Sequence, residues 1–369
     1  MKKFIFGLII IIVLIIIAGA ISEKNKTEPP TTPTTPTTPT APAPTTPPAP
    51  TIPPPVPPTT LTPAAVLTSR SFQMGFVPIT AQPLSTENWL AAFDLFKGSA
   101  EMIMHHVDFA ADALASVDFI SQMAERAGLK LFVVVDPLAH DRQALDPNLK
   151  KLGVNFADTK VRQAYKDLAV KLAGAYRPAY LGLGSEINTY LAKSDSELTA
   201  YLTLLGETVA AVKQASSRTV VTVSVQYEEL SGAGGRPAQW EMLRQLETKV
   251  EAVAFTTYPS PFFAAPDKLP ADYYTKIRAY TNKPLLIAES GWPTTGSASA
   301  SAANQVAFLE RLPELTKDLN LRLWIWWFPH DWAGAGYADV FKTMGLRQAN
   351  GAPKPAWDSW LKIKSLPIR

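Results

Sequence analysis

The sequence contains no cysteine. This absence excludes disulfide bonds, thiolate metal sites, a cysteine nucleophile and a lipid-modified cysteine anchor. Charge is also sparse, since charged residues make up 18% of the chain, the net charge is +3, and no basic run occurs beyond Lys2 and Lys3. Proteins that bind nucleic acids carry a much denser basic surface, so we expect no nucleic-acid partner.

The chain has enough apolar residues for one large core. It comprises 369 residues, of which 47% are hydrophobic. A single α/β barrel of roughly 250 to 300 residues would use most of this length, and a second catalytic domain would not fit. We therefore expect one globular domain, at residues 67–369, and expect it to be a monomer.

The N-terminus has the pattern of an export segment. Lys2 and Lys3 precede an apolar run from Phe4 to Ile21, which is typical of a signal peptide or a membrane anchor at residues 1–22. The small residues 18–20 offer a cleavage site, and the sequence leaves cleavage or anchoring open. The rest of the chain is expected outside the cytoplasm, secreted or held at the cell surface, with membrane contact only through residues 4–21 if they are retained.

Residues 23–66 form a Thr/Pro-rich linker. The stretch from Thr27 to Thr62 is composed almost entirely of Pro, Thr and Ala. This composition buries little apolar surface and favours extended polyproline conformations, so we expect a disordered stalk.

Beyond the linker, short apolar runs alternate with longer helical segments. This pattern predicts a (β/α)8 TIM barrel, because eight consecutive units on a parallel sheet close on themselves. A helix is expected to begin at Ser194, which forms a capping box with Glu197. The predicted strands are Phe72–Pro78, Met102–Val107, Leu129–Val135, Tyr180–Leu183, Thr219–Val225, Ala252–Phe255, Pro284–Ala288 and Arg322–Trp326.

Two of these strands end in a glutamate. Glu186 follows the fourth strand and Glu289 follows the seventh, and the strand ends of a parallel barrel share one face. Glycoside hydrolysis uses such a pair, with one carboxylic acid protonating the leaving oxygen and one carboxylate attacking the sugar or activating water. Asp108, Asp136, Glu228 and Glu229 lie on the same predicted face, and one of them as the acid would allow an inverting mechanism.

The motifs around these glutamates resemble those of the clan A retaining glycoside hydrolases. Residues 289–293, Glu-Ser-Gly-Trp-Pro, resemble the nucleophile motif of the family 17 endo-β-1,3-glucanases. Residues 184–188, Gly-Ser-Glu-Ile-Asn, resemble the acid/base region of the family 53 endo-β-1,4-galactanases. The resemblance covers roughly residues 72–361 and implies that Glu186 is the acid/base and Glu289 the nucleophile.

The resemblance also implies several sugar-binding residues. Tyr258 matches the clan's tyrosine beside the nucleophile, and Trp327 matches its sugar-stacking tryptophan. Ser185 is a departure, because clan members usually carry an asparagine there that binds the sugar 2-hydroxyl. Asn188 is a possible substitute, or else a residue at the start of a helix.

Trp292, His105 and His106 complete the predicted substrate-binding set. Trp292 follows the nucleophile and offers an apolar face to a sugar ring. The two histidines lie at the end of the second strand and offer hydrogen bonds to sugar hydroxyls. We expect neither a metal nor a cofactor, because no metal-binding spacing or dinucleotide motif occurs.

Together these features predict an exported retaining hydrolase of a β-linked polysaccharide such as a β-glucan or galactan. A non-catalytic barrel that binds carbohydrate in the cell envelope is one alternative, favoured by Ser185. A transglycosylase is another, because the same covalent intermediate can pass to a second sugar.

Overall fold

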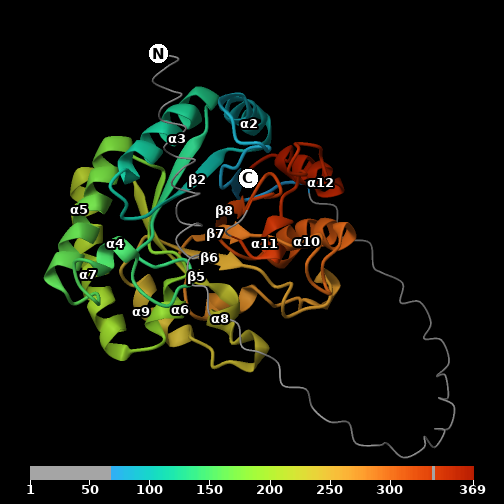
Figure 1. Ribbon diagram of the computed structural model, residues 1–369. Coiled ribbons are helices and arrows are strands. Elements are labelled where there is room, and N and C mark those ends of the chain that lie inside the picture. The colour runs from blue at the N-terminus through green and yellow to red at the C-terminus, as the bar shows by residue number, and fades with distance from the viewer. Residues whose placement is uncertain (1–67, 335–336) are drawn as a thin grey trace, which may run out of the picture.

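The structure is a computed structural model that describes residues 68–334 and 337–369 (Figure 1). The predicted signal or anchor segment at residues 1–22 and the linker at residues 23–66 lie outside the described residues. Among the helices of the described part, none is both long enough and apolar enough to cross a membrane.

Eight parallel strands form a closed barrel in the order β1 to β8, with β8 paired back to β1. The predicted fold class is thus confirmed, and β2 and β4 have the predicted bounds. The strands are β1 (Gln73–Phe76), β2 (Met102–Val107), β3 (Lys130–Val135), β4 (Tyr180–Leu183), β5 (Val220–Gln226), β6 (Ala252–Thr257), β7 (Leu285–Ser290) and β8 (Leu321–Trp326).

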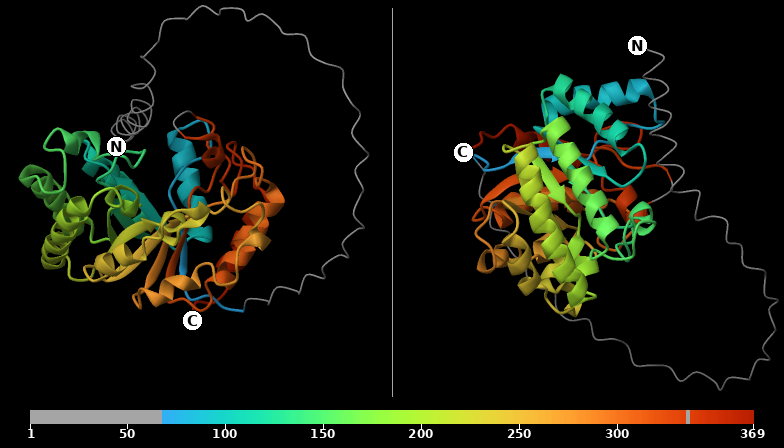
Figure 2. Two further views of the ribbon diagram at one scale, coloured as in Figure 1. Left: turned by 90° about the horizontal axis from the view of Figure 1, so that it is seen from below. Right: turned by 90° about the vertical axis from the view of Figure 1, so that its left-hand side faces the viewer.

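The helices surround the strands as an outer ring (Figure 1). The two long helices α5 and α7 lie side by side on one flank (Figure 2). The α-helices are α2 (Thr86–Ser99), α3 (Ala113–Ala127), α4 (Pro147–Lys150), α5 (Thr159–Tyr176), α6 (Ile187–Leu191), α7 (Asp195–Ala215), α8 (Tyr227–Ser231), α9 (Trp240–Glu247), α10 (Ala302–Leu315), α11 (Asp339–Lys342) and α12 (Pro355–Lys364). Short 3-10 turns are η1 (Ala233–Gly235), η2 (Pro266–Lys268) and η3 (Thr275–Ala279).

Helix α7 begins where the capping residues predict. The Ser194 hydroxyl accepts a hydrogen bond from the Glu197 backbone N–H at 3.4 Å. The Glu197 carboxylate does not return to Ser194 but accepts from the Phe156 backbone N–H at 3.2 Å and the Tyr190 hydroxyl at 3.3 Å. Only half of the capping box forms, because the carboxylate connects α7 to the loop before α5.

Strand alternation divides the apolar side chains into two cores. One row faces the barrel interior and includes Met104, Val134 and Ile325. The other row faces the helices and includes Trp324 and Trp326. Because successive residues of a strand point to opposite sides, the position of any strand residue relative to these rows tells whether it faces the interior.

An ion pair fastens the two ends of the described domain at the start of the strands. The Arg70 guanidinium is nearly buried and contacts Glu101 Oε1 at 2.6 Å. It also donates to the carbonyl oxygens of Lys364 at 3.0 Å and Leu366 at 3.1 Å. Glu101 in turn accepts from the Met74 backbone N–H at 2.7 Å. The first and last described segments therefore meet at the N-terminal ends of β1 and β2.

A buried carboxyl group supports the loop after β6. Glu228 is 1% exposed and accepts hydrogen bonds from Gln226 Nε2 and Thr257 Oγ1, both at 2.7 Å. It also accepts from the Tyr258 backbone N–H and the Tyr273 hydroxyl, both at 3.2 Å. Burial raises the pKa of Glu228 to about 7, although these donors work in the opposite direction.

We predict that Gly75→Ala destabilises the barrel. A Cβ at Gly75 would lie 2.2 Å from the Met102 carbonyl oxygen and 2.7 Å from Ile325 Cδ1. Such overpacking costs roughly 1–3 kcal/mol or more, measurable by urea unfolding. Gly98→Ala is the control, because it is exposed on α2 with nothing within 4 Å of the added Cβ, and it should gain roughly 0.5–1 kcal/mol. Equal stability of the two variants would contradict the packing.

We predict that Glu228 makes the protein less stable as the pH rises. Its pKa lies near 7 in the folded state against an ordinary 4.5, so between these values the folded state holds a proton that the unfolded state has released. Stability is therefore lost as the pH rises through this window.

Glu228→Gln cannot ionise, so its unfolding free energy should improve relative to the wild type by about 3 kcal/mol between pH 4.5 and pH 8. Urea titrations across this range measure the difference. Glu241→Gln, which alters an exposed carboxylate on α9, should show a constant difference. A constant difference for Glu228→Gln as well would refute the prediction.

Candidate active site

The C-terminal end of the barrel carries an inward-facing layer of polar and aromatic side chains. His106, Asp136, Thr256 and Trp327 each lie two residues beyond a side chain of the interior core. Because side chains alternate along a strand, all four face the interior at its open end. The predicted site residues His106 and Trp327 are thus brought together in one layer.

An irregularity in β7 brings Glu289 into this layer. The β6–β7 register runs from Phe255 opposite Ile287 directly to Thr256 opposite Glu289, and so passes over Ala288. Ala288 belongs to the interior core, and strict alternation would turn the next residue outward. The bulge instead places Glu289 level with Thr256, on the neighbouring strand about 4.8 Å away.

Glu289 is held by two side chains. It is 4% exposed, and its Oε2 accepts a hydrogen bond from the Tyr258 hydroxyl at 2.7 Å. His106 Nε2 lies 3.0 Å from Oε1. Burial, and then the charge of Glu289, raise the pKa of Tyr258 well above its ordinary value. The phenol therefore stays protonated and remains a donor to the carboxylate.

Glu186 is held by a different set. Its backbone is left-handed at φ 49°. Its Oε1 accepts from Thr256 Oγ1 at 2.6 Å, and its Oε2 accepts from Arg142 Nε at 3.3 Å. Arg142 also forms an ion pair with Asp136. The Thr256 hydroxyl bonds Glu186, and Thr256 lies opposite Glu289 in the sheet. Both glutamates are therefore neighbours of one residue.

The two glutamates influence each other electrostatically. Burial raises the pKa of Glu186, the charge of Arg142 lowers it, and the charge of Glu289 raises it, with a net upward shift. Glu186 therefore keeps a proton more readily than an exposed glutamate. A carboxyl group of this kind is suited to donate a proton, while Glu289 accepts a hydrogen bond from the Tyr258 phenol.

One ring nitrogen in the layer has no polar partner among the residues that the structure describes. Trp327 and His106 pack edge to face with ring centroids 6.0 Å apart. His106 Nε2 lies 3.0 Å from Glu289 Oε1, whereas Trp327 Nε1 is buried and makes no hydrogen bond to any described residue. Buried polar groups are rarely left unpaired, so the Trp327 nitrogen points to a bound molecule.

His105 and Trp292 lie outside the layer, which corrects the prediction for both. His105 is on the opposite side of β2, where its Nε2 lies 3.0 Å from Ser116 Oγ of α3. Burial, followed by the neighbouring His106, lowers the pKa of His105 to about 4. Trp292 is fully buried and donates from Nε1 to the Ser299 carbonyl oxygen at 3.0 Å. Neither ring is free to meet a sugar.

Asn188 is also occupied by the protein itself. Its Nδ2 donates to Gln239 Oε1 at 2.6 Å and to the Gln226 carbonyl oxygen at 3.2 Å, and its Oδ1 accepts from the Gln226 backbone N–H at 2.7 Å. It lies within α6 and fastens this helix to β5. Asn188 therefore does not substitute for the missing asparagine, and Ser185 is 1% exposed beside Glu186.

The remaining acids are less suited to proton transfer at this site. Asp108 is exposed and accepts from the Ala110 backbone N–H at 3.0 Å. Glu229 pairs with Arg236, and Glu228 lies in the buried network described above. Within residues 68–334 and 337–369, no group of three His, Asp or Glu side chains is arranged to hold a metal ion.

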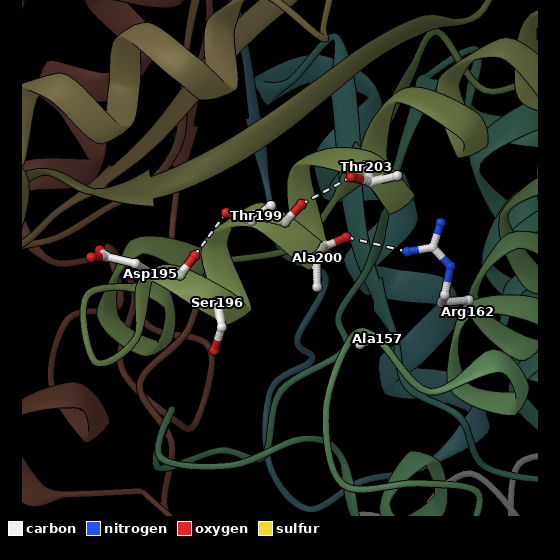
Figure 3. Close-up of a pocket in the computed structure, with 7 residues that line it drawn as sticks. All are labelled: Ala157, Arg162, Asp195, Ser196, Thr199, Ala200 and Thr203. Carbon is white, nitrogen blue, oxygen red and sulfur yellow. Dashed lines mark hydrogen bonds between the residues drawn. The ribbon is translucent and has the colours of Figure 1, made fainter.

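A separate surface pocket lies on the outer helices. It has a volume of about 490 Å³ and is lined by residues at the start of α5 and α7 (Figure 3). Arg162 closes one side by donating to the Ala200 carbonyl oxygen at 3.3 Å. None of the inward-facing carboxyl groups lines this pocket, so we assign the candidate active site to the barrel end instead.

No protein-family model matches the chain, and no curated protein does so either. Several solved structures share its fold. One is an exo-β-1,4-mannosidase from Opitutaceae bacterium strain TAV5, with TM-score 0.60 and 16% identity over 80% of this chain and 59% of that chain. Another is a family 5 subfamily 18 glycoside hydrolase from Streptomyces cattleya in complex with GlcNAc, with TM-score 0.62 and 14% identity over 82% and 83%.

A third is β-glucuronidase 2 from Bacteroides uniformis, with TM-score 0.54 and 14% identity over 81% of this chain and 35% of that chain. The chain thus spans 59% of the length of the mannosidase and about a third of that of the glucuronidase. At these identities the likeness concerns the fold. The chain has a (β/α)8 barrel of the kind found in these glycoside hydrolases.

Proposed function

We propose that the chain is a retaining glycoside hydrolase with Glu186 as acid/base and Glu289 as nucleophile. One observation carries the proposal: two carboxyl groups that both neighbour Thr256 lie at the open end of the barrel in unlike surroundings. Glu289 accepts from a phenol at 2.7 Å. Glu186 is buried beside a guanidinium and has a raised pKa. A double displacement requires one ionised and one protonated carboxyl group, and these are the roles that we propose for Glu289 and Glu186.

The geometry supports the following sequence of steps. Glu289 attacks the anomeric carbon while Glu186 gives its proton to the leaving oxygen, so the glycosidic C–O bond breaks and a glycosyl ester forms. Glu186, now ionised, takes a proton from water, whose oxygen attacks the same carbon and releases Glu289. Tyr258 holds the attacking carboxylate in place through both steps.

The substrate class follows from the unpaired groups of the site. Trp327 presents a partly exposed ring, and its buried Nε1 needs an acceptor. A pyranose supplies both an apolar face and hydroxyl oxygens. We propose a β-linked polysaccharide. The sequence motifs favour a β-glucan or galactan, and the mannosidase of similar fold adds β-mannan to the panel to be tested.

We further propose that the protein is exported, from the apolar run and Thr/Pro linker of the sequence. A polymeric substrate outside the cell suits such a location. Fractionation of cells with antibodies to the barrel, together with intact-mass measurement of the mature chain, tests export and cleavage of residues 1–22.

A barrel that binds carbohydrate without cleaving it is the second candidate. Ser185 favours it, because the serine stands where clan members carry a sugar-binding asparagine. Transfer of the glycosyl group to a second sugar instead of water is a further outcome of the same ester intermediate. Product analysis by mass spectrometry separates transfer from hydrolysis, and oligosaccharide binding without product would support the non-catalytic barrel.

We predict different effects for the two glutamates. Glu289→Ala should abolish reducing-end release from the polysaccharide, because no ester can form. Glu186→Ala should lower the rate on the polysaccharide by roughly 10²–10⁴-fold. On a dinitrophenyl β-glycoside, whose leaving group needs no proton, its first step should be retained, so the glycosyl ester accumulates as a mass increase on the protein.

Glu241→Ala is the matched control, because its carboxylate is exposed on α9, and it should leave turnover unchanged. Full activity of Glu289→Ala would exclude Glu289 as the nucleophile. Inversion of the anomeric centre, followed by proton NMR of the first product, would exclude the double displacement.

A further inference from the structure

One polar contact expected of a retaining site has no obvious residue. Hydrogen bonds to the sugar 2-hydroxyl strengthen in the transition state, yet Ser185 is short and Asn188 is bonded to Gln239 and Gln226. We propose that Arg142 binds this hydroxyl, the one next to the reacting carbon. The inference rests on the proposed function and adds a specificity-determining residue to it.

Arg142 is anchored beside Glu186 with donors to spare. Its Nη1 pairs with Asp136, which belongs to the inward-facing layer. Its Nε donates to Glu186 at 3.3 Å, which is long for a bond between charged groups. Nη2 has no acceptor anywhere in the described part of the chain, and the side chain is 18% exposed. A guanidinium carries five N–H donors, so several remain for a ligand.

The loop after β3 holds Arg142 in this place. The Ala139 N–H donates to the Ala144 carbonyl oxygen at 3.0 Å, and the Arg142 N–H donates to the Ala139 carbonyl oxygen at 2.8 Å. The Arg142 backbone has φ 58°, a left-handed conformation that is unfavourable for a side chain of this size. Local strain of this kind is found where a precise side-chain position matters to function.

The charges around Arg142 suit a neutral hydroxyl. Burial alone would lower the pKa of Arg142, but Asp136, Glu186 and, more weakly, Glu289 raise it, so the side chain stays charged. The guanidinium contacts Glu186 directly, and Glu186 shares Thr256 as a neighbour with Glu289, so its free donors lie beside the cleft where the reacting carbon and its neighbouring substituent would lie. Asp136 balances its charge, so the guanidinium does not oppose the positive charge that develops on the sugar ring.

Arg142→Gln is tested on matched pairs of substrates. The probes are dinitrophenyl β-glucoside and β-galactoside and their 2-deoxy counterparts. A hydrogen bond from a charged group is worth roughly 10- to 100-fold, so kcat/KM of the variant should fall by this factor on the hydroxylated probe. On the 2-deoxy probe the change should stay within about threefold, because the partner of Arg142 is already absent.

Several controls keep the test decisive. For each variant we compare kcat/KM on the hydroxylated probe with kcat/KM on the 2-deoxy probe. Partial unfolding lowers both values equally and so cancels from their ratio. Arg142→Lys keeps the positive charge but loses the planar guanidinium, so its kcat/KM on the hydroxylated probe should lie between those of the wild type and Arg142→Gln. Arg322→Gln, at an exposed position of β8, should leave kcat/KM unchanged on both probes. Equal losses of Arg142→Gln on both probes would overturn the inference.

Failure of the proposed function gives a different result. If the wild type turns over none of these glycosides or the polysaccharides, the hydrolase proposal fails. The dissociation constants of the same sugars, with and without the 2-hydroxyl, then test Arg142 by calorimetry. Equal discrimination by wild type and Arg142→Gln would refute its contact with the hydroxyl.

Discussion

The hydrogen-bonded pairing of β1 with β8 is the constraint on which the rest of the structure depends. It closes the sheet, so the inward-facing rows of all the strands converge on one opening. His106 of β2 and Trp327 after β8 meet edge to face only because β1 bridges their strands. In an open sheet the first and last strands would be its two edges, and these rings would lie at opposite ends of a row.

Thr256 gives the two carboxyl groups separate surroundings within this opening. It bonds Glu186 with its hydroxyl and pairs with Glu289 along the sheet. Glu186 contacts the guanidinium of Arg142, whereas Glu289 contacts the phenol of Tyr258 and the imidazole of His106. Chemically identical groups thus have different hydrogen-bond partners, and burial raises the pKa of Glu186.

Much of this arrangement was predictable from the sequence, and the failures have physical causes. Apolar runs identified the strands, and strand ends indicated Glu186 and Glu289. The alternation of side chains along a strand cannot reveal the bulge that turns Glu289 inward. The same alternation, applied to β2, would have placed His105 on the outer side of the barrel. Trp292 and Asn188 follow strand ends too, but the loops fold back and bury them. The position of Arg142 beside Glu186 was missed because Arg142 itself adopts a left-handed backbone conformation. No glycine marks this turn in the sequence.

The ion pair of Arg70 and Glu101 determines at which end of the barrel the chain enters the domain. It lies at the N-terminal ends of β1 and β2, whereas the glutamates lie at the C-terminal ends of β4 and β7. Any stalk attached ahead of Thr68 would join the barrel on the side away from its opening. Such an attachment would leave the loops around the opening clear of the junction with the stalk.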